Sequence, residues 1–407
     1  MTTSSRAHEL LAPQTTTLRA AELLPLISAQ AAEADRTRTV SAEVISAIKA
    51  SDLMVLSATK ELGGLEESVA GIALELEGVA AACASTAWCL WNHLCVFHLF
   101  CGALGPAHAE LLGRIVETHG WVCFPGGAGS KVHARDEGDT LVLEGSAAFG
   151  SGSRYADWTG VAFAMIDPAT GKIGSPPDLR FSVIELAQPG VRIEPTWDGA
   201  SLRASSTDDV YYDGVAVPAD RWSSWWAADR AGKLRDPDLQ VLSHRYREDW
   251  VGFSDLWLAA MAVGVTYAAL QDAVAEVGGR KAIMGRPMAQ MAGVHFNLGR
   301  AAIAAMAARS TTLASCAEVD ARVEAGVIPT EADYLRQMSA SVRALADCEV
   351  AMGHLRKLLG GNGLREGHWF ERRQRDFQAM PIHINAHEDR VSERLGRYLL
   401  DLDPGLF

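Results

Sequence analysis

Apolar residues along this 407-residue chain follow a helical period in two long regions that flank a central region with a different pattern. Helical spacing runs from Thr17 to about Gly113, and it returns after the tryptophan-rich connector at 222–230. Between about Gly120 and Arg221, short apolar runs alternate with Gly, Ser and Asp, which is typical of strands joined by turns. The pattern predicts helices, then a β region without any helical stretch, then a long helical bundle.

Individual helices can be placed within this order. The segment from Glu66 to Phe100 is too apolar for a surface helix, so we expect it to be buried among other helices or in a subunit interface. The helical pattern at 331–361 ends in glycines suited to a C-cap. Pro381 suits the first position of a last long helix, because its missing N–H would be unsatisfied there anyway. His383 would then lie in the first helical turn, where the positive end of the helix dipole favours a neutral imidazole.

Composition and charge narrow the functional classes. Lys and Arg number 37 against 50 Asp and Glu, which gives a net charge of −13 and argues against nonspecific binding to nucleic acid or membrane surfaces. By eye, no apolar run reaches the roughly 20 residues needed to span a bilayer, and the start of the chain lacks a signal pattern. The seven cysteines contain no Cys-x-x-Cys pair and are expected to be buried free thiols. These features predict a cytoplasmic protein.

Four local motifs then resemble the acyl-CoA dehydrogenase superfamily in the right order. The stretch at 124–131, FPGGAGSK, resembles the first flavin-contacting loop, although the usual Thr-Glu-Pro is missing. The stretch at 196–221 resembles the end of the β domain, where Gly-x-x-x-Arg-x-Ser-Ser leads to a Val-Pro exit. Residues 280–290 resemble the Arg-x-x-Phe-Gly-x-Pro segment, and LGGNG at 359–363 followed by Arg375-Asp376 resembles the C-terminal signature.

The resemblance covers nearly the whole chain and implies its architecture. We expect an α+β fold with an N-terminal helical domain at 1–118, a central β-barrel-like domain at 119–222 and a C-terminal four-helix bundle at 223–407. Proteins of this fold are usually homotetramers built on the C-terminal bundle, so a tetramer or a dimer is expected.

One departure from the dehydrogenase pattern bears on the chemistry. The dehydrogenases carry a catalytic Glu a few residues after the Arg-Asp pair, whereas this chain has His383 and Ile384 there. Without a base for the α-proton, oxidation of an acyl thioester has no obvious route. A His at this spacing from Arg375 resembles the flavin-dependent monooxygenases of the same fold, which include phenol, indole and thiophene oxygenases.

That branch implies a two-component enzyme. It would bind reduced FAD (FADH2) or reduced FMN (FMNH2), delivered by a separate flavin reductase, and would take O2 as co-substrate. A C4a-hydroperoxide would then transfer one oxygen atom to an electron-rich aromatic substrate such as an indole or a phenol. N- or S-oxygenation on the same fold and an acyl-CoA dehydrogenase with a relocated base remain alternatives.

The same resemblance implies roles for particular residues. Ser151, in the turn Phe149-Gly150-Ser151-Gly152, would lie near flavin N5. His383 would act as an acid, base or orienting group, and His93 would position the substrate. His98 is the rival of His93, because the two lie five residues apart and cannot share a helix face well. For all three histidines, a packing or helix-terminal role is the alternative.

The expected cofactor contacts come from both halves of the chain. The glycines near 360 follow a helix instead of a strand, which argues against a dinucleotide-binding loop and fits a turn that approaches flavin in a neighbouring subunit. Arg280 and Lys281 would contact flavin phosphates from the same or another subunit. The expected cofactor-binding residues are Phe124, Gly126, Gly127, Gly129, Ser130, Ser151, Gly152, Arg280, Lys281, Gly360 and Gly361.

A metal site is the remaining alternative for the C-terminal histidines. His383 and His387 are spaced i, i+4, but the residues between them lack the Glu of a His-Glu-x-x-His zinc site. No upstream carboxylate cluster suggests a third ligand, so no metal is expected.

Overall fold

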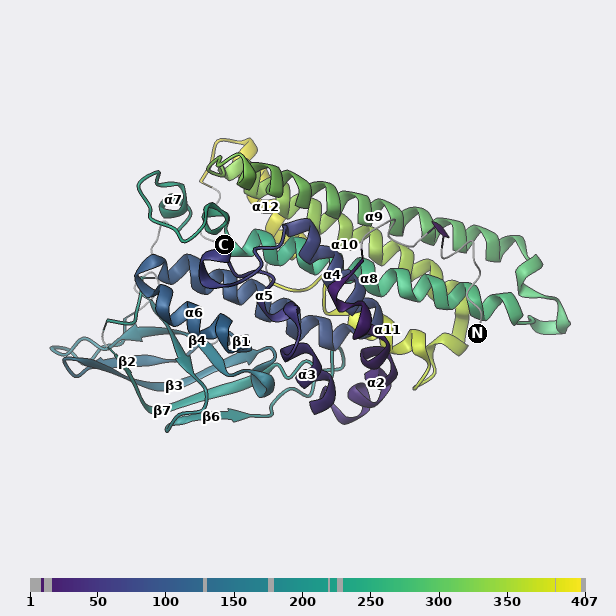
Figure 1. Ribbon diagram of the computed structural model, residues 1–407. Coiled ribbons are helices and arrows are strands. Elements are labelled where there is room, and N and C mark those ends of the chain that lie inside the picture. Colours follow the sequence, from purple (N-terminus) through teal and green to yellow (C-terminus); the bar gives the residue numbers. More distant parts are fainter. Residues whose placement is uncertain are drawn as a thin grey trace.

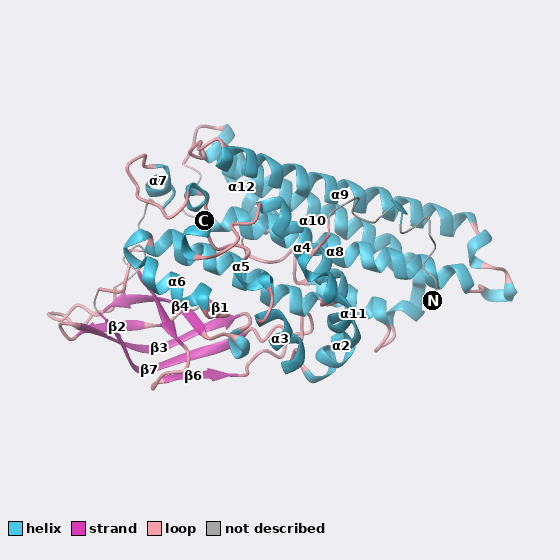
Figure 2. Ribbon diagram, viewed as in Figure 1, coloured by secondary structure: helices cyan, strands magenta, loops and turns pink. Residues whose placement is uncertain are grey.

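A computed structural model describes residues 9–10, 17–126, 130–174, 179–218, 220–224, 230–384 and 386–403. Strands and long helices occupy separate regions: the sheet lies at one end, and three long helices extend from above it to the far side of the molecule (Figures 1 and 2). The helix α5 lies between the sheet and these long helices (Figure 1). The order of elements is the one that the hydrophobic pattern predicts.

In the N-terminal region, α4 packs against α2, α5 and the bundle helix α8 (Trp250–Gly279). The expected apolar segment from Glu66 to Phe100 is two helices, because Cys83 adopts an extended conformation (φ −152°, ψ 113°) and ends the first of them. The second helix, α5, is buried along almost its whole length. The helices are α2 (Leu24–Thr37), α3 (Ala42–Lys49), α4 (Val69–Ala82), α5 (Ala84–Leu104) and α6 (Ala109–Glu117), with 3-10 turns at Arg19–Glu22, Asp52–Val55, Lys60–Leu62 and Pro106–His108.

The described strands form a mixed sheet in the order β1-β4-β2-β3-β7-β6, with β5 paired to β4. Strands β1 and β2 run parallel to β4, and the remaining pairs are antiparallel. The strands are β1 (Val122–Cys123), β2 (His133–Asp136), β3 (Thr140–Gly150), β4 (Trp158–Met165), β5 (Arg180–Glu185), β6 (Val191–Glu194) and β7 (Asp208–Pro218). A 3-10 turn at Ser153–Tyr155 contradicts the expectation of no helical stretch here, because the left-handed Gly152 (φ +76°) coils the chain between β3 and β4.

The C-terminal region is a bundle of long helices. Gly360 ends α10 with φ +61°, which confirms the glycine C-cap, and Thr330 begins the same helix with a reciprocal capping box to Asp333. The helices are α7 (Arg230–Arg235), α8 (Trp250–Gly279), α9 (Ala292–Glu324), α10 (Glu331–Leu359), α11 (Trp369–Gln378) and α12 (Glu388–Leu399), with 3-10 turns at His244–Arg247, Ile283–Gly285, Met288–Gln290 and Gly360–Leu364.

The start of the last helix is a correction. It begins at Glu388 with His387 as its N-cap, whereas the proline signal predicted a start at Pro381. The chain before it forms a hydrogen-bonded turn, in which the His383 N–H donates to the Met380 carbonyl. Two acidic residues in the first turn, Glu388 and Asp389, favour the observed start because they complement the positive end of the helix dipole.

The N-terminal helices and the bundle share one hydrophobic core, and the sheet has a smaller core of its own. Helices α4 and α8 approach closely at Gly264, where an added Cβ would lie 2.1 Å from the Glu77 carbonyl oxygen. Two helices, Ala84–Leu104 and Trp250–Gly279, are long and apolar enough to cross a membrane by composition, which corrects the expectation of no such run. Their apolar windows are 83% and 100% buried inside the protein, as in the core helices of globular proteins.

Candidate active site

The turn that follows β3 holds an aromatic side chain in an unusual conformation. Phe149 has φ +64°, which is rare for a bulky residue, and it remains 61% exposed. The neighbouring glycines fit tightly: an added Cβ at Gly150 would lie 3.3 Å from Pro125, and one at Gly152 would lie 3.3 Å from Trp121 Nε1. The turn therefore packs closely against α5 and the residues on either side of β1, while the Phe149 ring is exposed to solvent.

Ser151, in the same turn, belongs to a buried chain of hydroxyl groups. Its Oγ accepts a hydrogen bond from Trp88 Nε1 at 2.9 Å and pairs with Thr207 Oγ1 at 3.1 Å. Thr207 Oγ1 in turn pairs with Ser205 Oγ at 2.7 Å. When Ser205 donates to Thr207 and Thr207 donates to Ser151, the Ser151 oxygen accepts twice and its own O–H remains as a donor.

His383 lies against the same region of α5. Its ring meets Trp88 edge-on with centroids 5.6 Å apart, and it meets Trp91 in the same way at 5.2 Å. Trp88 therefore contacts both Ser151 and His383, and the structure brings these two predicted residues into one neighbourhood. The Trp91 indole is fixed by a 2.9 Å hydrogen bond to the Ser254 carbonyl of α8.

The neutrality expected for His383 has a different cause from the predicted one. Because His383 precedes α12, no helix dipole acts on it as a first-turn residue. Burial lowers its pKa from 6.5 to about 4, and the nearby positive charge of Arg390 acts in the same direction. Its Nδ1 atom is enclosed and has no hydrogen-bond partner among the described residues.

Two further buried groups near this place were not predicted from the sequence. Asp255 of α8 is fully buried, and neither of its carboxyl oxygens has a hydrogen-bond partner in the described structure. Asn92 of α5 likewise has an enclosed Oδ1 that no described group satisfies. A signal for Asp255 exists in the sequence, because it is the only charged residue between Val251 and Gln271.

His93 is placed differently from His383. Its Nδ1 accepts the Val122 N–H at 3.0 Å, and its Nε2 donates to the Met54 carbonyl at 2.8 Å. Burial lowers its pKa to about 4. Both ring nitrogens are thus used to hold α5 against β1 and the turn at Asp52–Val55. Its rival His98 bonds the Glu248 carbonyl at 2.9 Å, and its Nδ1 has no partner among the described residues.

The predicted flavin loop lies beside the Ser151 turn. Phe124 is buried against Phe181, with ring centroids 5.7 Å apart, and the Gly126 N–H bonds the Phe124 carbonyl. Ser130 donates to the Ala162 carbonyl of β4 at 3.1 Å. Gly127 and Gly129 lie outside the described residues.

Four of the predicted cofactor contacts lie elsewhere in the subunit. Arg280 follows the end of α8, about 38 Å along the helix from Asp255 at 1.5 Å per residue. Gly360 and Gly361 begin the 3-10 turn after α10, and the Arg280 guanidinium reaches the Leu359 carbonyl before them. Within one chain, the ends of α8 and α10 that lead to these residues and to Lys281 lie on the far side of the molecule from the sheet (Figure 1).

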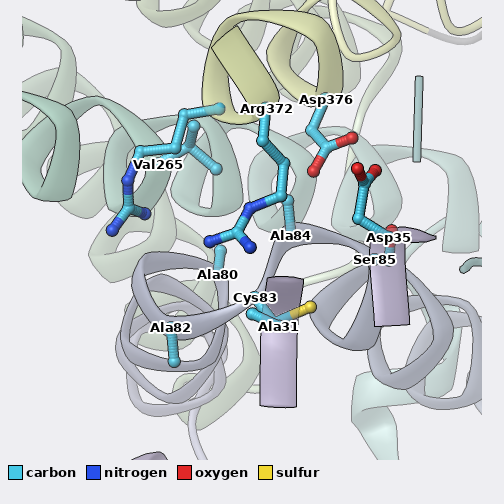
Figure 3. A pocket seen from close by; sticks show the side chains of 11 residues that line it. Ala31, Asp35, Ala80, Ala82, Cys83, Ala84, Ser85, Val265, Arg372 and Asp376 are labelled. Atoms are coloured by element: carbon cyan, nitrogen blue, oxygen red, sulfur yellow. The ribbon is translucent and has the colours of Figure 1, made fainter. Parts of the chain in front are cut away.

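The Arg375-Asp376 pair ties α11 to other parts of the fold. Arg375 bonds both carboxyl oxygens of Asp35 on α2, at 3.1 and 2.9 Å, and the Ala200 carbonyl at 2.8 Å. Asp376 accepts the Leu202 N–H at 2.7 Å, and burial raises its pKa to about 6. Figure 3 shows Asp35 and Asp376 facing each other across a small hollow beside Arg372. In this part of the chain and the rest of the described residues, His, Cys, Asp and Glu side chains do not gather in groups that could hold a metal ion.

Comparisons with known proteins agree with this architecture. The family model described as "Acyl-CoA dehydrogenase, C-terminal domain" matches residues 256–388. An indole-3-acetate monooxygenase of Pseudomonas putida is 28% identical over 79% of this chain and 78% of its own length. The oxygenase component of an FADH(2)-dependent resorcinol hydroxylase from Rhizobium sp. is 25% identical over 95% of this chain and 94% of its own. The mouse mitochondrial short-chain specific acyl-CoA dehydrogenase is 24% identical over 94% and 87%, respectively.

Solved structures extend the likeness to the whole chain. XiaF from Streptomyces sp., in complex with FADH2 and glycerol, superposes with a TM-score of 0.84 at 20% identity over 99% of this chain and 97% of its own. Indole-bound TdsC from Paenibacillus sp. A11-2 superposes with a TM-score of 0.81 at 19% identity over 99% and 100%. The chain therefore has the acyl-CoA dehydrogenase fold and is related to the flavin-dependent monooxygenases that share it.

Proposed function

We propose that this protein is the oxygenase component of a two-component flavin-dependent monooxygenase that hydroxylates an electron-rich aromatic substrate, such as an indole or a phenol. The overall reaction converts the substrate C–H, O2 and a reduced flavin into the hydroxylated product, water and oxidised flavin. The related indole-3-acetate monooxygenase and resorcinol hydroxylase component support this substrate class and a separate reductase.

The observation that carries the proposal is the environment of His383. A dehydrogenase needs an ionised carboxylate close to the reacting carbon. The residue in that place here is an imidazole that is neutral at pH 7, packed edge-on against Trp88 and Trp91. A neutral imidazole between two aromatic rings suits orientation of a planar substrate and exchange of a proton with its ring substituent.

The turn at Phe149–Gly152 fits a reduced flavin. The exposed Phe149 ring offers a flat apolar face. When Thr207 donates to Ser151, the Ser151 O–H is free to donate to a ligand. Reduced FAD or FMN, when bound, supplies the two electrons that activate O2. The protein's part is to bind the ring, to donate this hydrogen bond and to exclude water.

The C-terminal bundle supports an oligomer. Large apolar side chains are exposed on it: Phe296 and Ile303 on α9 are 65% and 67% exposed, and Ile283 and Met284 after α8 are 94% and 99% exposed. Such a surface indicates a covered interface. In a homotetramer or dimer, this face would let Arg280, Lys281, Gly360 and Gly361 contact flavin bound by a neighbouring subunit.

A cytoplasmic location completes the proposal. All seven cysteines are free and buried, which suits a reducing compartment. Burial also raises the pKa of the Cys95, Cys101, Cys123 and Cys348 thiols to about 12, so these side chains are packing residues instead of reactive thiolates.

The test is a single-turnover mixing experiment. Photoreduced FAD or FMN is bound anaerobically and then mixed with oxygenated buffer, with and without indole. We expect H2O2 release to fall by the amount of hydroxylated product formed when indole is present. Stoichiometric H2O2 and no product, with indole, phenol and resorcinol alike, would contradict the proposal.

One observation favours an acyl-CoA dehydrogenase as the second candidate. Asp255 is a buried carboxyl group on α8 without a hydrogen-bond partner among the described residues, and it could serve as a relocated base once it is ionised. The dehydrogenase alternative requires oxidised flavin to bind tightly and to be bleached by an acyl-CoA without oxygen. We expect no bleaching with short- or medium-chain acyl-CoA.

A further inference from the structure

We propose that Asp255, together with Asn92 and His383, forms a polar recognition site for an N–H or O–H group on the aromatic substrate. This inference rests on the proposed function and adds which feature of the substrate is recognised. It predicts a substrate that carries a hydrogen-bond donor on its ring, such as an indole N–H or a phenolic O–H.

The first argument is the lack of partners inside the protein. Asp255 is 0% exposed, yet both of its carboxyl oxygens lack a partner among the described residues. Leaving a buried polar group without a hydrogen bond is costly, and most such groups in folded proteins are satisfied. An orphaned carboxyl group in the second turn of α8, within the apolar stretch that runs to Leu270, therefore indicates a ligand that completes it.

The second argument is the position of Asp255 relative to His383. Trp91 joins the two elements, because its ring contacts His383 and its indole N–H bonds the carbonyl of Ser254, the residue before Asp255. The charge of Arg390 acts on both side chains, since it lowers the pKa of His383 and opposes the rise in that of Asp255. Trp91 thus contacts His383 and is bonded to the turn of α8 that carries Asp255.

The third argument places Asn92 at the same region. Cys95 of α5 lies close to Ser254 and Asp255 of α8, because both residues act on the pKa of its thiol. Asn92 precedes Cys95 by three residues and follows Trp88 by four, which puts all three on one face of α5. The unpartnered Oδ1 of Asn92 therefore belongs to the same face as the tryptophan that contacts His383.

The chemistry of these atoms indicates a donor on the ligand. Asn92 Oδ1 can only accept, and a carboxyl group accepts through at least one oxygen in either protonation state. A neutral imidazole accepts through one nitrogen. The charged groups that act on Asp255 are Asp249, which repels negative charge, and Arg390, which attracts it. An N–H or O–H on the substrate can donate to Asn92 Oδ1 and to a carboxyl oxygen of Asp255 in either protonation state.

The experiment compares ligands that differ only in the donor. Binding of indole against 1-methylindole, and of phenol against anisole, is measured by calorimetry on the full chain without flavin and with oxidised flavin. We expect the wild type to bind the donor member of each pair at least about tenfold more tightly, since sites built around a substrate hydrogen bond reject analogues that lack it. Asp255→Leu should reduce this preference to less than about twofold. Asp255→Asn, which keeps one acceptor oxygen and the side-chain shape, should give an intermediate preference.

Asp272→Asn on the same helix is the matched control, because Asp272 is 44% exposed and pairs with Arg373 instead of facing the site. It should leave the preference unchanged. Equal affinity for both members of each pair in the wild type would overturn the proposal, and so would an undiminished preference in Asp255→Leu or, if that variant does not fold, in Asp255→Asn. Failure of the proposed function would look different: ligand preference would persist, but no product would form from reduced flavin and O2.

Discussion

Two sets of buried polar side chains, one around Arg375 and Asp376 and one around His383, differ in how completely they are paired. In the first, Arg375 bonds Asp35 and the Ala200 carbonyl, and Asp376 bonds the Leu202 N–H. In the second, His383 Nδ1, Asn92 Oδ1 and both Asp255 oxygens have no partner among the described residues. The difference indicates that the first set holds the fold together and the second is kept for a ligand.

We expect the largest effect, a loss of folding stability, when the pairing around Arg375 and Asp376 is broken. Arg375→Ala leaves the Asp35 carboxylate without its bidentate partner at a site where Arg375 is only 15% exposed. Breaking a buried pair in this way costs about 3–5 kcal/mol, to be measured as the free energy of unfolding in urea. Arg336→Ala is the control, because Arg336 is 61% exposed and should change stability by less than about 0.5 kcal/mol. A loss of stability below about 1 kcal/mol for Arg375→Ala would contradict the inference that the first set holds the fold together.

The second effect concerns activity instead of stability. His383→Leu should lower product formed per reduced flavin by about 100-fold or more, the usual contribution of a positioned acid or base. The same change removes an unpartnered nitrogen, so the free energy of unfolding should stay the same or rise. Retained product yield would show that His383 is a packing residue.

The third effect separates two histidines with similarly low pKa values. His93→Leu deprives the Met54 carbonyl and the Val122 N–H of their partners and should cost about 2 kcal/mol of stability. Binding of indole should change little, because His93 has no free nitrogen to offer it. If His93→Leu abolished indole binding without a loss of stability, the substrate-positioning role implied by the sequence resemblance would regain support.

A smaller effect is the response of stability to acid. Burial lowers the pKa of His93 and His383 to about 4 and that of His98 to about 3. The unfolded chain takes up protons on these residues as the pH falls below about 6.5, while the folded chain does not. Their contribution to stability is therefore present above about pH 6.5 and is lost as the pH falls toward 4.

Asp376 acts in the opposite direction. Its raised pKa, about 6, gives a contribution that is present below its unfolded value of 3.8 and is lost as the pH rises through 6. Asp255 acts in the same direction as Asp376, because burial raises its pKa as well. The histidine contribution is therefore measured by comparison: between pH 6.5 and 4, the melting temperature of the wild type should fall more, or rise less, than that of His383→Leu. An identical pH profile in the two proteins would contradict the neutral state of His383.

The sequence predicted the fold well because its signals are local. Turn-forming glycines, the shift from helical to strand period and the cap at Gly360 act over a few residues. The start of α12 was misplaced because Pro381 and the acidic pair at Glu388 are competing local signals, and only tertiary packing decides between them. The partners of His93 could not be predicted, since Met54 and Val122 are far from it in the sequence.

The candidate site was predictable only in part for the same reason. Ser151 and His383 were placed by resemblance, but their connection through Trp88 depends on how α5 packs against the sheet and the C-terminal turn. Asp255 showed a sequence signal, the single charge between Val251 and Gln271, yet its lack of partners can be seen only in three dimensions. The proposed flavin contacts of Arg280 and Gly360 would require a second subunit and remain predictions.

The central claim is that Ser151 and His383 form one site joined by Trp88. Its most direct test is the ratio of H2O2 to hydroxylated product that the Trp88→Phe variant forms from O2. This variant removes the indole N–H that bonds Ser151 Oγ at 2.9 Å, and Trp369→Phe is its control, because it removes a similar 3.1 Å bond to Glu276 elsewhere. In a single turnover with reduced flavin, O2 and indole, we predict that Trp88→Phe releases several-fold more H2O2 and less product than wild type. Trp369→Phe should match the wild type. An unchanged ratio of H2O2 to product in Trp88→Phe would contradict the claim.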